Sequence, residues 1–77
     1  MDDSSKKILA LLDVLIQNQK NHILKMARSI VPDVTDEDLL QPNDFPELEM
    51  HPYFRYEEGI LHAFLAAKAA IQTEIAN

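Results

Sequence analysis

Residues 51–64, HPYFRYEEGILHAF, hold the side chains of this chain that are best suited to chemistry. Glu58 and His62 are spaced i, i+4, so on a helix they would be neighbours on one face. A carboxylate and an imidazole at that spacing could bind a metal ion, but two ligands are too few unless another chain adds more. Exposed ion pairs of this kind are common on helices, and Arg55 at i, i+3 from Glu58 would support one. We therefore expect Glu58 and His62 to form ordinary helix surface.

Glu57 differs from its neighbour Glu58, because helical spacing places it on the apolar side of the segment. Gln19 lies in the same way among the apolar residues of the first part of the chain, and His22 lies at their edge. A buried carboxylate needs hydrogen-bond donors. We therefore predict a buried polar layer in which Glu57 hydrogen-bonds Gln19 or His22, either within one chain or across a dimer. The alternatives are that Glu57 reaches solvent near the start of its helix or, less favoured, that it has a catalytic role.

Further chemical sites are not predicted. The chain has no cysteine, which excludes disulfides and thiolate metal sites. It has a single glycine, and therefore no glycine-rich phosphate loop, and no serine is arranged with a nearby base as a nucleophile. We expect a protein with no catalytic residue, no cofactor and no metal site, and hence no enzymatic activity.

Two long segments must position these side chains, and they flank a connection that holds Pro32, Pro42 and Pro46, while Pro52 lies at the start of the second segment. The spacing of apolar residues predicts helices over about 5–31 and about 52–76. Ser4 or Ser5 is expected to cap the first helix, and Pro32 to end it, because the residue before a proline avoids the α conformation.

Each helix is expected to have one main apolar face, at about 100° of rotation per residue. On the first helix this face comprises Ile8, Leu12, Leu15, Ile16, Ile23, Met26, Ala27 and Ile30. On the second helix it comprises Tyr53, Ile60, Phe64, Ala67, Ile71 and Ile75, with Leu61 beside them. Pro52 suits the first position of this second helix, where its missing N–H is not needed, and His51 or a nearby acid is the expected cap.

The connection, 32–51, is acidic, with seven Asp or Glu residues and no Lys or Arg. Thr35 and Asp38 have the spacing of a capping box, which predicts one short helix at about 36–41. The apolar residues of the connection are expected to pack against the adjacent end of the two helices: Leu39, Leu40, Phe45, Leu48 and Met50.

These elements predict an all-α fold, a single domain over 1–77 in which two helices form an antiparallel hairpin with a long ordered connection. Chains of this size bury only about 60% of the surface exposed on unfolding, and this one has no disulfide to compensate. Several apolar residues lie beside the main faces and are candidates for an interface: Leu11, Val14, Leu24, Phe54 and Leu65. We therefore expect oligomerisation, most simply two hairpins forming a four-helix bundle.

Net charge and hydropathy restrict the partners. The net charge of −6 argues against nucleic acid, which requires a surplus of Lys and Arg. The apolar run Ile8–Ile16 is shorter than the ~20 residues that cross a bilayer, and the N-terminus lacks the basic start of a signal peptide. We expect a cytoplasmic protein that binds neither nucleic acid nor membranes.

The function that this pattern favours is a small protein–protein interaction module, such as an adaptor, a scaffold or a chaperone-like subunit. Its partners would be a second copy of the chain and, beyond that, another protein. The alternative is a helix-bundle protein that binds a metal or a small ligand at the oligomer interface. That site would use Glu57, Glu58, His22 and His62.

Overall fold

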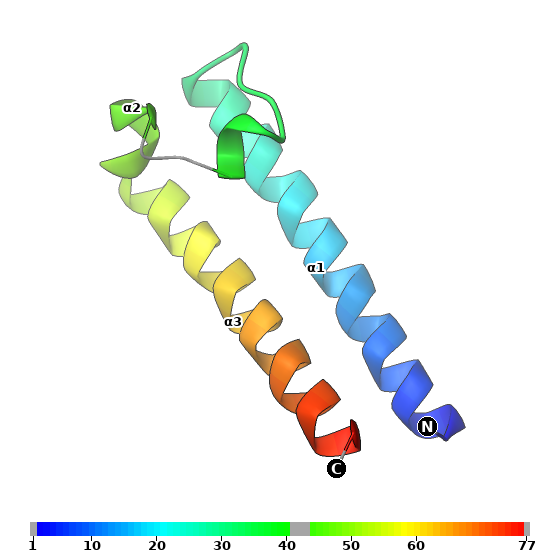
Figure 1. Cartoon of the computed structure of the whole chain (residues 1–77). Coiled ribbons are helices and arrows are strands. Elements are labelled where there is room, and N and C mark those ends of the chain that lie inside the picture. The colour runs from blue at the N-terminus through cyan, green and yellow to red at the C-terminus, as the bar shows by residue number, and fades with distance from the viewer. Residues whose placement is uncertain (1, 41–43, 77) are drawn as a thin grey trace.

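The computed structural model of the chain describes residues 2–40 and 44–76, and all regular structure in these ranges is helical. Two long helices, α1 (Asp3–Ile30) and α3 (Pro52–Ala76), run antiparallel and pack on each other as a hairpin (Figure 1). Between them lie the 3₁₀ turn η1 (Asp38–Leu40) and the one-turn helix α2 (Pro46–Glu49). The molecule is elongated, 43 × 19 × 17 Å, as two long helices side by side require.

The start of α1 lies earlier than expected because Asp2, rather than Ser4 or Ser5, caps it. The Asp2 carboxylate accepts a hydrogen bond from the backbone N–H of Ser5 at 2.7 Å. This bond, followed by one from the Ser5 hydroxyl, lowers the pKa of Asp2 below its ordinary value. The helix ends at Ile30, just before the Val31–Pro32 step that disfavours helical backbone.

The start of α3 at Pro52 agrees with the predicted boundary. The His51 carbonyl accepts the backbone N–H of Arg55 at 3.0 Å. Its ring nitrogen Nδ1 lies 3.4 Å from the backbone nitrogen of Phe54 and accepts a long hydrogen bond there. His51 therefore serves two of the N–H groups that the first turn of a helix leaves without partners.

The connection is folded differently from the predicted short helix at about 36–41. The described part of that range forms only η1, while Gln41 lies outside the described residues. Thr35 and Asp38 do form a reciprocal capping box: the Thr35 N–H donates to the Asp38 carboxylate at 3.0 Å, and the Asp38 N–H donates to the Thr35 hydroxyl at 3.3 Å. Helix α2 was not predicted, and its Pro46 lies in the first turn, where proline is tolerated.

The buried core lies at the closed end of the hairpin, where the connection covers the gap between the two long helices. Its residues come from α1, the connection, α2 and α3, and they are Ile23, Ala27, Val34, Leu48 and Phe54. In the open half, formed by residues 3–19 of α1 and 60–76 of α3, Ile16 is the one buried residue among those described. The closed end therefore has a core with several walls, whereas the open end is a bare pair of helices.

The two long helices meet along a seam whose residues alternate in spacings of three and four, as in coiled coils. On α1 the covered seam positions are Leu9, Leu12, Ile16, Gln19, Ile23, Met26 and Ile30. On α3 they are Phe54, Glu57, Leu61, Phe64, Lys68, Ile71 and Ile75. The polar members of the seam each have a partner, and Lys68 Nζ lies 2.6 Å from Asp13 Oδ1.

The predicted apolar face of α3 is rotated away from the observed seam, whereas most of the face predicted for α1 is covered. Tyr53 was expected to face α1, but its side chain is 71% exposed, while Phe54 takes the inward position. Ile8 and Leu15 of α1 are likewise exposed. Polar Glu57 and Lys68 occupy seam positions, so a pattern based on hydropathy alone places the apolar face to one side of them.

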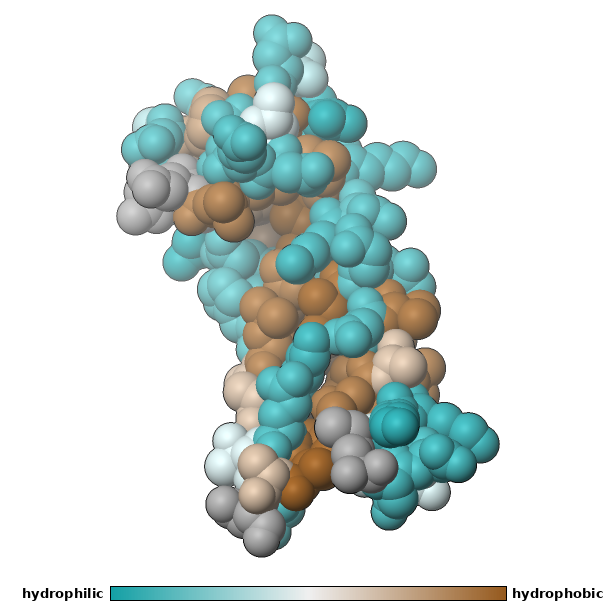
Figure 2. Space-filling model, turned by 45° about the vertical axis from the view of Figure 1, so that its right-hand side comes forward, coloured by the Kyte–Doolittle hydropathy of each residue, from teal (hydrophilic) through white to brown (hydrophobic). Residues whose placement is uncertain are grey.

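The surface keeps large apolar side chains in contact with solvent. In Figure 2, brown hydrophobic residues run along the hairpin between teal polar ones. None of the helices, over the described residues, has a stretch that is both long and apolar enough to span a bilayer. The exposed large apolar residues are Ile8, Leu11, Val14, Leu15, Leu40, Met50, Tyr53, Tyr56 and Leu65.

Replacing Gly59 with alanine is expected to stabilise the hairpin. Gly59 lies inside α3 with negative φ, and an added Cβ would have no neighbour within 4 Å. Alanine at such a helical position is favoured over glycine by about 0.5–1 kcal/mol. We expect a melting temperature about 2–8 °C higher in a circular dichroism melt. An unchanged or lower melting temperature would contradict the exposed helical environment given to Gly59.

Candidate functional site

The residues of the predicted polar layer lie together in the seam between α1 and α3. Gln19 Nε2 lies 2.8 Å from the carboxylate oxygen Oε2 of Glu57 and also 2.8 Å from the Glu57 backbone carbonyl oxygen. His22 Nε2 lies 3.5 Å from the same Oε2. All of these atoms belong to one chain, so the layer needs no second copy to assemble.

Within this layer the carboxylate is more deeply buried than the imidazole beside it. The Glu57 side chain is 17% exposed, whereas that of His22 is 53% exposed and remains open to solvent. The Gln19 amide carries two N–H groups, which matches its two acceptors on Glu57. A shift of α3 along α1 would separate these groups and leave the carboxylate among apolar residues, so the layer favours one register of the two helices.

Glu58 is covered to the same degree as Glu57, contrary to the expectation that it lies on open surface. Its side chain is 15% exposed, and its Oε1 lies 3.1 Å from Nη1 of Arg55. His62 is exposed, and within the described ranges no ion pair joins it to Glu58. Residues of η1 line the same groove as Glu58, so the connection borders this side of α3, which helical periodicity alone does not reveal.

A groove of about 790 Å³ lies between α1, η1 and α3, on the side of the hairpin where η1 lies in front of α1 in Figure 1. Its apolar lining consists of Ile23, Leu39, Leu40, Phe54, Leu61 and Leu65. Its polar lining consists of Gln17, Lys20, Asp36, Glu37, Arg55, Glu58 and His62. The sequence alone does not predict this groove, because it depends on where η1 lies against the two long helices.

The predicted interface residues separate into three environments. Leu11 and Val14 are exposed on α1, and Leu65 is exposed at the edge of the groove. Leu24 is half-buried and packs against the core. The assignment of Phe54 to an interface is wrong, since it is 1% exposed and packs in the chain's own core with residues of the connection and α2.

The four residues of the alternative metal or ligand site do not converge within one chain. His22 and Glu57 form the seam layer, whereas Glu58 and His62 line the groove. Within residues 2–40 and 44–76, no group of three or more His, Asp or Glu side chains is close enough to hold a metal ion.

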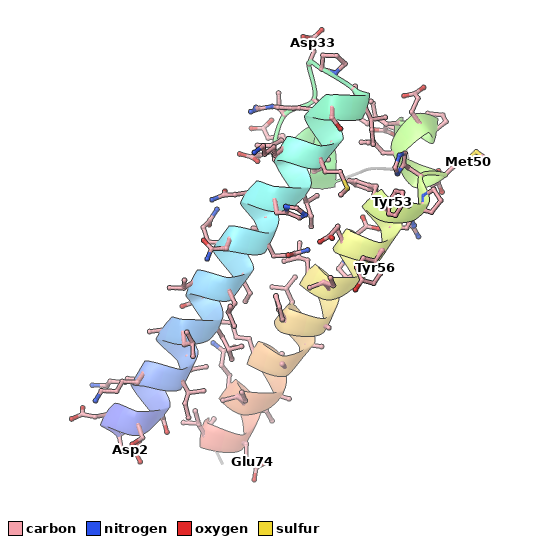
Figure 3. All side chains as sticks on the ribbon, turned by 180° about the vertical axis from the view of Figure 1, so that it is seen from behind. Asp2, Asp33, Met50, Tyr53, Tyr56 and Glu74 are labelled. Carbon is pink, nitrogen blue, oxygen red and sulfur yellow. The ribbon has the colours of Figure 1, made fainter. Side chains whose placement is uncertain are left out.

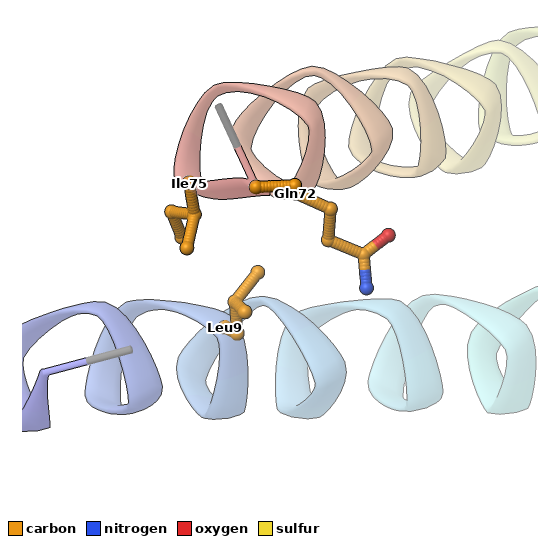
Figure 4. A pocket seen from close by; sticks show the side chains of 4 residues that line it. Leu9, Gln72 and Ile75 are labelled. Carbon is orange, nitrogen blue, oxygen red and sulfur yellow. The ribbon is translucent and has the colours of Figure 1, made fainter.

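A second hollow, of about 420 Å³, lies at the open end of the hairpin (Figure 4). Leu9 of α1 and Gln72, Ile75 and Ala76 of α3 line it. None of the residues named above as candidates for chemistry borders it, so it offers apolar contact rather than a reactive site.

Comparison with known protein families, with curated proteins and with solved structures gave no match for this chain. A proposal for its function therefore rests on the fold and the side chains of this chain alone.

Proposed function

We propose that this chain is a non-catalytic protein–protein interaction module that works as a homodimer, with two hairpins packed as a four-helix bundle. The observation that carries the proposal is a second apolar stripe on α1, separate from the seam with α3. Ile8, Leu11 and Leu15 form this stripe, and Leu11 is 60% exposed. We call these three residues the α1 stripe.

The spacing of the α1 stripe supports a helical partner. Positions 8, 11 and 15 repeat the three–four spacing of the seam, displaced to one side of it. A helix with two such stripes is typical of a bundle, in which each helix contacts more than one neighbour. None of the α1 stripe residues lines the groove, so the two surfaces are distinct.

Helix α3 offers a matching second stripe of smaller residues. Positions 60, 63, 67 and 70 carry Ile60, Ala63, Ala67 and Ala70 at the same three–four spacing, and the three alanines are exposed. The same spacing continues toward the start of α3 through Tyr56 and Tyr53, which are seen from behind in Figure 3. Large residues on one copy and alanines on the other would let two helices approach closely in a self-complementary interface.

The weakness of the open end also favours a partner. Isolated helices in water are marginal unless an apolar face is packed. In the open half the two helices cover each other along a single seam, and most apolar side chains there remain partly or fully exposed. A second hairpin placed against the α1 stripe would bury this surface and give the open half a core.

The test of the dimer is Leu11→Glu, with Val14→Glu as the matched control. Burial of Leu11 twice in a symmetric dimer would contribute about 3–6 kcal/mol, so a glutamate there should weaken dimerisation by about 100-fold or more. Size-exclusion chromatography with light scattering should give the mass of a dimer for the parent and a monomer for Leu11→Glu. Val14 is equally apolar and exposed but lies off the stripe, so Val14→Glu should remain dimeric.

Two results would contradict this proposal. The first is a monomeric parent chain at concentrations well above the dissociation constant expected for such a bundle. The second is a parent dimer that both substitutions leave intact, which would move the interface away from the α1 stripe.

A further inference from the structure

We propose that the groove between α1, η1 and α3 binds a basic amphipathic helix of a partner protein. The proposal rests on the proposed role as an interaction module, but it does not depend on the dimer, because the α1 stripe lies outside the groove. It names the chemistry of the partner, namely apolar side chains on one face and Lys or Arg along one flank.

The apolar part of the groove has the dimensions of a short helix. On α3 it is lined from Phe54 to Leu65, a rise of about 16 Å at 1.5 Å per residue. That is the length of about three turns, which present apolar residues at i, i+3 or i+4, and i+7. Leu61 and Leu65 lie one turn apart and offer apolar contacts at successive turns. Phe54 lies two turns before Leu61, is 1% exposed and closes that end of the floor.

Both margins of the groove expose leucine. Leu40 of η1 is 81% exposed and Leu65 of α3 is 41% exposed. Neither contributes to the chain's own core, yet both line the same groove. These two leucines would lie on either side of an apolar ligand. Binding of that ligand would remove both leucine side chains from water.

The charge of the groove selects a basic partner. Asp36 and Glu37 line the margin formed by the connection, and both are exposed with no ion pair to any described residue. They belong to segment 32–51, which has seven acidic residues and no Lys or Arg. A Lys or Arg on the partner would face these carboxylates, and long-range attraction would favour its approach.

The opposite margin explains why only one flank of the partner should be basic. Lys20 of α1 lines that margin, and Arg55 is already paired with Glu58. A partner helix with Lys or Arg on both flanks would place like charge against Lys20. A neutral or acidic second flank fits the groove better and fixes the direction in which the helix lies.

The probe that tests the proposal is a fluorescent synthetic helix of Leu, Ala and Lys, with leucines at i, i+4 and i+7 and lysines on one flank. Fluorescence anisotropy should show saturable binding to the parent chain that weakens with added salt. A peptide with the same leucines and Glu in place of Lys should bind at least about tenfold more weakly. Asp36→Asn together with Glu37→Gln should reduce this preference for the basic peptide.

Leu65→Glu and Leu11→Glu form a matched pair that separates this proposal from the dimer. Leu65→Glu places a charge on the groove and should weaken peptide binding by about tenfold or more. Leu11→Glu should leave the affinity of each chain for the peptide unchanged, even where it converts a dimer to a monomer. If Leu65→Glu fails to fold by circular dichroism, Leu40→Glu, at a more exposed position, replaces it.

Three outcomes would overturn the groove proposal. Equal binding of the basic and acidic peptides would remove the charge argument. Unchanged peptide binding by both the Leu65→Glu and the Leu40→Glu variants would place the peptide elsewhere. Conversion of a parent dimer to a monomer by Leu65→Glu would mean that a second copy of the chain, rather than a basic partner, occupies the groove.

Discussion

Phe54→Ala is expected to remove a large part of the folding free energy of this chain. Phe54 is the largest fully buried side chain and contacts the core that α1, the connection and α2 share. Deletion of a buried phenylalanine ring costs about 3–5 kcal/mol. A domain of this size has a total of about 4–12 kcal/mol. At about 4–8 °C per kcal/mol, the variant should melt at least about 12 °C below the parent. Thermal and urea unfolding followed by circular dichroism measure the loss.

Tyr53→Ala is the matched control for this prediction. It removes an aromatic ring from the adjacent position of α3, but that ring is 71% exposed, and its aromatic neighbour is His51 at 5.8 Å between ring centroids. Surface substitutions of this kind change stability by about 0.5 kcal/mol or less. If Tyr53→Ala is instead the more damaging of the two, α3 is rotated from the orientation described above, toward the one that hydropathy predicts.

The existence and extent of the long helices follow from local rules. Pro52 and the Val31–Pro32 step are boundaries that any reading of the sequence can place, and the structure ends α1 and begins α3 close to them. The cap of α1 was less predictable, because Asp2, Ser4 and Ser5 are all suitable capping residues within the same few positions.

The rotation of the helices was not predictable from hydropathy, for a specific reason. On α1 the predicted face lies between the seam, which includes Ile16, and the α1 stripe, which includes Leu11 and Leu15. On α3 it lies between the seam, which includes Leu61, and the second stripe at positions 60–70. Helical periodicity gives only the mean direction of all apolar residues of a helix. When a helix has two apolar stripes, this mean direction lies between them. The displacement is larger on α3, where polar Glu57 and Lys68 occupy seam positions, than on α1, whose seam is apolar except for Gln19.

The connection shows where local reasoning fails. The capping box of Thr35 and Asp38 was identified from four residues of sequence, and it forms. The positions of η1 and α2 depend instead on contacts with the long helices, such as those of Leu48 and Val34 with Phe54 in the core. These contacts are distant in sequence, so neither the covered state of Glu58 nor the groove could be deduced from periodicity.

The two ends of the hairpin carry different surfaces, and this arrangement suits an interaction module. The closed end has its own core and supports the groove, whose shape depends on η1. The open end lacks a core and carries the α1 stripe. In the proposed dimer, self-association would stabilise the open end and leave a groove in each hairpin for a partner.

Gln19→Leu is expected to destabilise the hairpin by about 1.5–3 kcal/mol, although it places an apolar residue in an apolar seam. The Gln19 amide is the donor nearest to the Glu57 carboxylate, at 2.8 Å. Without it, a carboxylate that is 17% exposed keeps only His22, 3.5 Å away, and loses a hydrogen bond of the charged kind. Urea unfolding should show a lower midpoint with an unchanged slope.

The double variant Gln19→Leu with Glu57→Leu should recover this stability and exceed that of the parent, because it removes the carboxylate together with its donor. Glu57→Leu alone leaves the Gln19 amide without its carboxylate acceptor. The losses of unfolding free energy in the two single variants should therefore not add up to that of the double variant. A double-mutant cycle should give a coupling free energy of about 1.5–3 kcal/mol between the two side chains. The seam then keeps Lys68 as its one polar position and fixes the register less strongly, so light scattering should show a broader range of assemblies for the double variant than for the parent. Additive effects in the cycle, or a Gln19→Leu variant that unfolds like the parent, would show that Gln19 and Glu57 are neighbours without energetic coupling.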